Sequence, residues 1–95
     1  MMITRLVKMT FAAETLQLFE AAFASKEELI RAYPGCLEMN IYCSASDPRL
    51  RFTISRWENE TALEDYRKSE LFRSTWAEVK QWFAAPAEAW TLETF

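Results

Sequence analysis

The chain has 95 residues, of which 51% are hydrophobic and 15% aromatic, with a formal net charge of −3 at pH 7 and no histidine. A chain this short predicts one domain, residues 1–95, and its apolar content is large for one small core. Nucleic-acid binding needs several cations against phosphates, and no window approaches the roughly 18 apolar residues of a membrane span, so neither partner is expected. The N-terminus lacks the features of a signal peptide, which favours a cytoplasmic location.

Two segments of different period open the chain. Residues 3–11 alternate apolar and polar side chains and predict a strand, whose apolar face also carries Arg5. Residues 12–33 change to a helical period and predict a long helix, with a second helix start and a kink near 24–26. A Pro-Gly pair at 34–35 then ends the helix.

A β-hairpin is predicted in the middle of the chain. Residues 36–43 and 50–57 alternate as strands, and residues 44–49 between them are rich in turn-forming Ser, Asp and Pro. The short connection predicts an antiparallel pair. The side of the later strand expected to face the helices holds its aliphatic and aromatic residues at alternate positions: Leu50, Phe52 and Ile54. The opposite side then holds Trp57, together with Tyr42 of the earlier strand.

Two short helices and a last strand complete the chain. Residues 59–69 begin with Asn59 as a helix N-cap, and Ser69 is placed to cap a second helix. The apolar stripe of that second helix is predicted to contain Phe72, Trp76, Val79 and Phe83. Pro86 is expected to end the helical region, and residues 87–95 alternate as a final strand.

The element order β-α-β-β-α-α-β predicts an α+β, ferredoxin-like fold, in which the helices cover one face of an antiparallel sheet. The other face is expected to carry Leu6, Tyr42 and Trp57 among polar residues. That mixture is too aromatic for a surface in contact with water alone. Contact with a second copy would bury it, so we predict a homodimer with Tyr42 and Trp57 at the interface.

Two stretches resemble the antibiotic biosynthesis monooxygenase family: "PGC" (34–36) and "RFTISRWENETALEDYRKSELF" (51–72). The second is similar to the family's pattern of a strand ending in Trp, an acidic or Asn turn, a short helix and a Ser-x-x-Phe element. The resemblance implies a dimeric α+β barrel. The family includes cofactor-free oxygenases of hydroxyaromatic substrates, haem-degrading enzymes, an isomerase of a phosphorylated signalling metabolite, and stress proteins.

The haem-degrading branch can be compared residue by residue. Its members resemble this chain in the Ser-x-x-Phe helix, but they carry the iron-ligating histidine where Trp76 stands and a first-strand Asn where Arg5 stands. The indole N–H of Trp is a donor only and cannot ligate iron. Because no histidine is present elsewhere, haem is not expected as a cofactor.

The resemblance also implies the walls of a pocket. Tyr66 and Trp76 are similar in position to two walls of the family's pocket, one on each short helix, and we expect Phe52 and Phe72 to complete them. The alternative is that these aromatic residues are ordinary core residues. Ser69, between the helices, would set the angle at which they meet.

Two cations are candidates for contact with a substrate anion. Arg5 lies on the side of its strand predicted to face the helices, where a cation is costly to bury, and Lys68 lies next to the helix break. Arg5 could instead reach water or pair with a glutamate, and Lys68 could be an ordinary surface lysine. With no histidine, paired carboxylates, metal-ligand spacing or Gly-rich phosphate loop, no catalytic residue and no metal site are identified.

These observations favour a homodimeric, cofactor-independent monooxygenase-like enzyme acting on a small hydroxyaromatic or quinol. An electron-rich anion can pass one electron to triplet O₂ and then recombine with it, so the protein need only bind the aromatic, favour its anion and exclude water. The alternatives are a non-catalytic small-molecule-binding dimer and an isomerase on the same scaffold. Phosphorylated substrates would need more cations than Arg5 and Lys68 supply.

Overall fold

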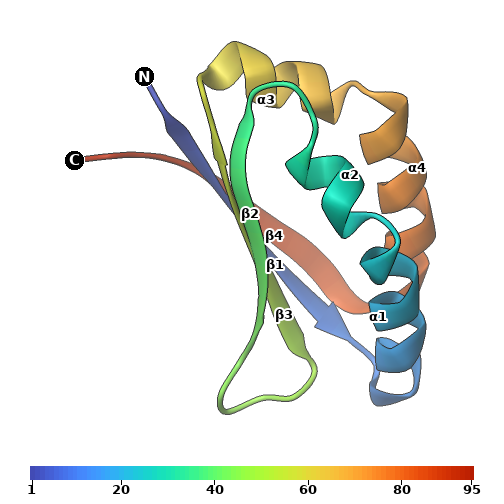
Figure 1. Ribbon diagram of the computed structural model, residues 1–95. Helices are drawn as coiled ribbons and strands as arrows, with labels where there is room; N and C mark the ends of the chain where they lie inside the picture. Colours follow the sequence, from blue (N-terminus) through green and yellow to red (C-terminus); the bar gives the residue numbers. More distant parts are fainter.

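The computed structural model describes residues 1–95 as one four-stranded antiparallel sheet with all helices on one face (Figure 1). The strand order is β2-β3-β1-β4. The elements in chain order are β1 (Ile3–Phe11), the 3-10 helix η1 (Ala13–Thr15), α1 (Leu16–Ala24), α2 (Glu27–Arg31), β2 (Cys36–Cys43), β3 (Leu50–Trp57), α3 (Glu60–Arg67), α4 (Glu70–Val79), the 3-10 helix η2 (Lys80–Trp82) and β4 (Phe83–Glu93). The α+β, ferredoxin-like fold predicted from the sequence is confirmed. None of the helices has the length and apolarity required to cross a membrane.

The first helical segment is broken where the sequence predicts a kink. Helix α1 ends at Ala24 and α2 begins at Glu27. Ser25 follows the end of α1 and donates its hydroxyl to the carbonyl of Ala22 at 2.8 Å, so it belongs to that end and does not cap α2. Gly35 then has φ of 88°, and a Cβ there would lie 2.5 Å from the Cβ of Ala62 in α3. Glycine therefore allows the loop before β2 to approach α3.

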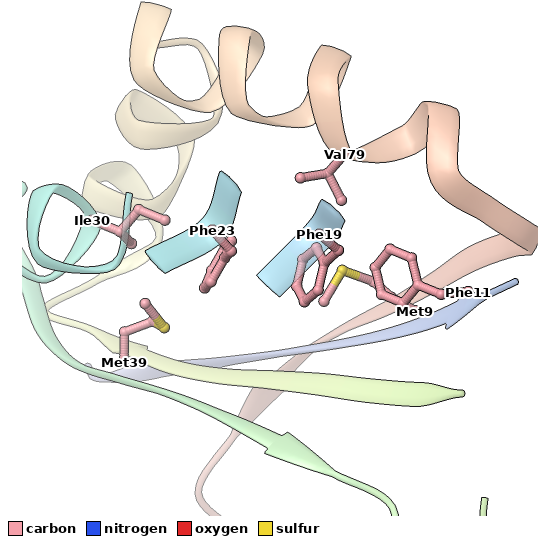
Figure 2. Close-up of a cluster of buried hydrophobic side chains, with 7 residues drawn as sticks. All are labelled: Met9, Phe11, Phe19, Phe23, Ile30, Met39 and Val79. Carbon is pink, nitrogen blue, oxygen red and sulfur yellow. The ribbon is translucent and has the colours of Figure 1, made fainter. Parts of the chain in front are cut away.

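The main core lies between the sheet and helices α1, α2 and α4. Figure 2 shows its seven buried residues: Met9, Phe11, Phe19, Phe23, Ile30, Met39 and Val79. The rings of Phe11 and Phe19 are 4.3 Å apart at their centroids. Burying each large apolar side chain contributes about 1.5–3 kcal/mol. A smaller cluster of Ile3, Trp57 and Leu63 packs separately between the sheet and α3.

Strand β3 presents its two faces in the opposite sense to the prediction. Ser55 and Trp57 are paired across the sheet with residues of the helix-facing side of β1. Trp57 is fully buried, and its indole N–H donates to the Ser55 hydroxyl at 3.0 Å, which satisfies the one polar group of the ring. Phe52 lies opposite Lys8 and Tyr42, on the face without helices. The prediction that Trp57 lies at a dimer interface was therefore wrong, as was the helix-facing assignment of Leu50, Phe52 and Ile54.

The last strand begins earlier than predicted. Phe83, predicted on the stripe of α4, is the first residue of β4 and packs edge-on against Trp76 with centroids 5.5 Å apart. Pro86 lies inside β4, close to a shift in its register with β1. Because β4 is an edge strand, a residue without a backbone N–H is tolerated there.

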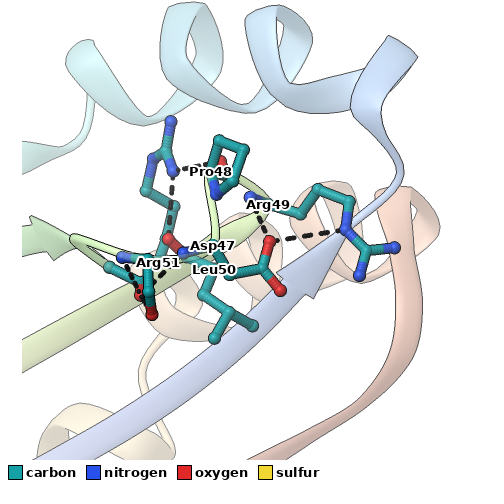
Figure 3. Close-up of polar contacts among 7 residues, drawn as sticks. Asp47, Pro48, Arg49, Leu50 and Arg51 are labelled. Carbon is teal, nitrogen blue, oxygen red and sulfur yellow. Dashed lines mark hydrogen bonds and ion pairs between the residues drawn. The ribbon is translucent and has the colours of Figure 1, made fainter.

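The predicted turn at 44–49 joins β2 and β3 as a hairpin and is held by side-chain hydrogen bonds (Figure 3). The Asp47 carboxylate accepts the backbone N–H of Arg49 at 3.0 Å, and this bond lowers the pKa of Asp47. Arg51 donates to the carbonyl of Pro48 at 2.8 Å. This turn lies at the end of the sheet away from both chain termini.

Candidate functional site

A cavity of about 280 Å³ lies between the helices and the sheet, and most of its lining is hydrophobic. Residues of all four strands and of α1 to α4 line it. Arg67 of α3 and Ala89 of β4 are lining residues that are exposed, so the cavity opens beside them. Ligand pockets usually measure roughly 300–1,000 Å³, so this one suits a ligand of one or two rings.

A row of aromatic rings forms the helical wall of the cavity. Tyr66 of α3 meets Phe72 of α4 edge-on at 5.3 Å, and Phe72 stacks on Trp76 at 5.9 Å with 8° between the ring planes. The Ser69 hydroxyl accepts the Phe72 backbone N–H at 3.1 Å and donates to the Tyr66 carbonyl at 2.6 Å. Ser69 thus ties together the two helices that hold these rings. Tyr66, Phe72 and Trp76 all line the cavity, where the sequence places them.

Two arginines line the cavity as well. Arg5 of β1 donates from Nη1 to the Thr91 hydroxyl of β4 at 2.7 Å and forms no ion pair. Arg67 of α3 pairs with Glu64 at 2.9 Å. Burial lowers the pKa of Arg5, and the nearby charge of Arg67 lowers it further, while Glu64 opposes that change. The pairing of Arg5 with a glutamate, considered from the sequence, is not observed.

Two of the predicted site residues lie outside the cavity. Phe52 is on the face of the sheet without helices, because β3 has the orientation described above. Lys68 is exposed at the C-terminal end of α3, while its neighbour Arg67 lines the cavity. Successive positions of an α-helix point about 100° apart, so the side chains of Arg67 and Lys68 leave α3 in different directions. The predictions for Phe52 and Lys68 as pocket residues were wrong.

The sequence contains a pattern that could have identified Arg67 as a lining residue. Arg67 follows the buried residue Leu63 by four positions, and such residues share one face of a helix. Thr75 of α4 was missed in the same way, since it follows Phe72 by three positions and precedes Val79 by four. Thr75 lines the cavity and is 6% exposed, and its hydroxyl has no hydrogen-bond partner. A threonine inside a helix often bonds to the carbonyl four residues earlier, and Thr75 does not.

The titratable groups of the lining are all hydrogen-bond donors at neutral pH. Burial raises the pKa of the Tyr66 phenol, so this hydroxyl stays protonated. Arg5 and Arg67 carry guanidinium groups, which do not lose their protons in proteins. The cavity can therefore hold an aromatic ring and stabilise an anion, but its own side chains do not offer a general base. No group of three or more His, Cys, Asp and Glu side chains is arranged to hold a metal ion.

Known proteins resemble this chain both in a family model and in their folds. A family model described as antibiotic biosynthesis monooxygenase matches residues 2–78. Among solved structures, the Rv0793 protein of Mycobacterium tuberculosis has a TM-score of 0.92 at 19% identity, with 100% of this chain and 96% of that chain covered. A conserved protein of Methanosarcina mazei has a TM-score of 0.95 at 18% identity, covering 99% and 93%. A structure described as an antibiotic biosynthesis monooxygenase has a TM-score of 0.92 at 15% identity, covering 98% of each chain. At these identities the structural likeness shows the fold. No curated protein gives a significant match.

Proposed function

The chain belongs to the antibiotic biosynthesis monooxygenase family, and on this premise we propose that it is a cofactor-independent monooxygenase acting on a small hydroxyaromatic or quinol with O₂. The observation that carries the proposal is the composition of the cavity. A row of three aromatic rings lines the same cavity as Arg5, a partly buried cation without an ion-pair partner. Such a cavity suits a flat ring that develops negative charge on an oxygen.

The reaction begins with a substrate that binds as, or becomes, its phenolate. The phenolic proton leaves to water, since the lining has no proton acceptor, and Arg5 and the Tyr66 hydroxyl stabilise the oxyanion by donating hydrogen bonds. The anion passes one electron to O₂, and the resulting radical and superoxide combine into a C–O bond. The peroxide takes a proton from water, its O–O bond breaks, and a ring proton leaves, which yields a quinone and one water molecule.

A homodimer is part of the proposal. The open face of the sheet, defined here by Leu6, Tyr42, Phe52, Ile54, Trp90 and Leu92, has no helix over it. Tyr42, Trp90 and Leu92 on this face are each more than two-fifths exposed. Large exposed apolar side chains gathered on one face mark a contact site in soluble proteins, and a second copy would cover them.

The test is oxygen uptake by metal-stripped protein with hydroquinones, naphthols and anthrones, in the presence of superoxide dismutase and catalase. We expect uptake above the rate of autoxidation, and its loss in Trp76→Ala and reduction in Tyr66→Phe. Tyr33→Phe is the matched control, because Tyr33 contacts the Tyr66 ring but does not line the cavity. Lack of protein-dependent uptake across the panel would count decisively against the proposal.

A non-catalytic binding role is the second candidate function. It is favoured by the lining itself, whose titratable groups Arg5, Tyr66 and Arg67 all hold protons at neutral pH and cannot act as a base. Quenching of Trp fluorescence by the same aromatic compounds, without consumption of O₂, would support this role over catalysis.

A further inference from the structure

The charges at one end of the cavity do not cancel. Arg5 makes one hydrogen bond, to the neutral Thr91 hydroxyl, and has no carboxylate partner. A guanidinium carries five N–H donors, so most of the hydrogen-bonding capacity of Arg5 is unused within the chain. Placing a partly buried cation without a counter-ion costs free energy, and an anion bound there would offset that cost.

Arg67 brings a second guanidinium to the same cavity. Burial is the main cause of the lowered pKa of Arg5, the charge of Arg67 adds to it, and the partner of Arg67 itself is Glu64. Glu64 is also the carboxylate whose charge acts on Arg5. Two cations and one carboxylate leave a surplus of one positive charge at this end. The surplus matches a ligand group with a single negative charge better than a phosphate dianion.

We propose that Arg5 and Arg67 form a carboxylate subsite, so that the ligand is a hydroxyaromatic acid of one or two rings. Its carboxylate lies between the two guanidinium groups, and its ring lies against Tyr66, Phe72 and Trp76. The unused N–H donors of Arg5 are enough to contact the carboxylate and an adjacent phenolic oxygen together. This inference rests on the proposed function for the identity of the cavity as the substrate site. Planar guanidinium groups bind a carboxylate through paired hydrogen bonds, which also fixes its orientation.

The lack of a base in the cavity supports the same ligand class. A carboxylic acid has a pKa of about 4 and is already ionised at neutral pH, whereas a phenol has a pKa near 10. A hydroxyaromatic acid therefore arrives as an anion and needs no proton removed in order to bind. The row of aromatic rings then holds the part of the molecule that reacts with O₂.

The test compares two ligands that differ only in the carboxylate, 1-hydroxy-2-naphthoate and 1-naphthol, by isothermal titration calorimetry. Hydrogen bonds to charged groups contribute about 1.5–3 kcal/mol, so we expect the acid to bind about tenfold or more tightly than the naphthol. Arg5→Gln and Arg67→Gln should remove most of that preference. Lys68→Gln is the matched control, because it loses the same charge one residue away but outside the cavity.

Three results would overturn the subsite: equal affinity for the two ligands, an equal loss in Lys68→Gln and Arg67→Gln, or failure of both ligands to bind. The proposed function is judged separately by oxygen uptake. Protein-dependent uptake with naphthol or hydroquinone and no preference for the acid would leave the oxygenase standing and remove the carboxylate subsite. Thermal unfolding of each variant verifies that it is folded, which we expect for Arg67→Gln because Arg67 is exposed.

Discussion

Burial of Tyr66 has a measurable consequence for the pH dependence of stability. Its ring stacks on Trp57 with centroids 4.8 Å apart, and burial raises the pKa of its phenol, with smaller contributions from Cys36 and Tyr33. The unfolded chain loses the phenolic proton first, once the pH passes about 10. The contribution of this group to stability is therefore complete below that pH and is lost as the pH rises towards the folded pKa.

As the pH rises from about 9 to about 11.5, we expect the free energy of unfolding to fall less in Tyr66→Phe than in the wild type. Urea unfolding at each pH measures this difference. Burial also raises the pKa of Cys36, which adds a loss of the same sign to both proteins. Tyr33→Phe is the control, because it removes a neighbouring phenol and leaves the Tyr66 hydroxyl in place. Parallel slopes for wild type and Tyr66→Phe would contradict the raised pKa.

Thr75 lines the cavity at a cost to the stability of the fold. Its hydroxyl is buried without a partner, and such a group costs about 1–3 kcal/mol. Replacing it with the similarly shaped valine should therefore raise the free energy of unfolding by about 1 kcal/mol. Denaturant unfolding gives this value directly. A lower free energy of unfolding for Thr75→Val than for the wild type would mean that the hydroxyl has a partner in solution, such as a bound water.

Single residues also show where prediction from the sequence succeeds and where it stops. Arg5, Tyr66 and Trp76 were placed at the pocket by strand alternation and by the family resemblance, and all three line the cavity. Lys68 was chosen and Arg67 missed because both flank the helix break and carry the same charge. The orientation of α3, which is fixed by burial of Leu63, decides that Arg67 and not Lys68 faces the cavity.

At the scale of elements, the junction of α3 and α4 controls the aromatic wall. Ser69 caps α4 and also bonds to the last turn of α3, so loss of its hydroxyl affects both helices. Ser69→Ala should lower the free energy of unfolding by about 1 kcal/mol, the usual cost of losing an N-cap. It should also weaken aromatic binding, because Tyr66 and Phe72 would lose their fixed relation.

Asn59→Ala is the matched control for this prediction. Asn59 caps α3 by accepting the Ala62 N–H at 2.8 Å, and it does not line the cavity. We expect a similar loss of stability in urea unfolding without the loss of binding in calorimetric titration. If both variants weaken ligand binding equally, the effect comes from general destabilisation and not from the wall.

Strand β3 explains the main error of the sequence-based prediction. Apolar residues occupy both of its faces, with Phe52 and Ile54 on one and Trp57 on the other. Alternation identifies a strand in such a segment, but it does not decide which face meets the helices. The hydrogen bond from Trp57 to Ser55 makes burial of the indole favourable, and this contact is visible only in three dimensions.

At the scale of the whole molecule, the same orientation of β3 changes the composition of the open face. Phe52 and Ile54 lie there with Tyr42, while Trp57 does not. The face is thus more aliphatic than the sequence predicts, and its edge strand β4 adds Trp90 and Leu92. An apolar sheet face with no covering layer is typical of sheets that pack against another sheet.

We therefore expect sedimentation at micromolar concentration to give about twice the 11.2 kDa mass of the chain. Ile54→Glu should shift the equilibrium towards monomer, because a carboxylate in the centre of an apolar contact would be desolvated without a partner. Leu18→Glu is the control, since Leu18 is 52% exposed on α1, away from the open face. A wild-type monomer would show that the open face tolerates water, and equal dissociation by both variants would place the contact elsewhere. Monomer formation by Ile54→Glu alone would identify the open face as the surface through which two copies meet.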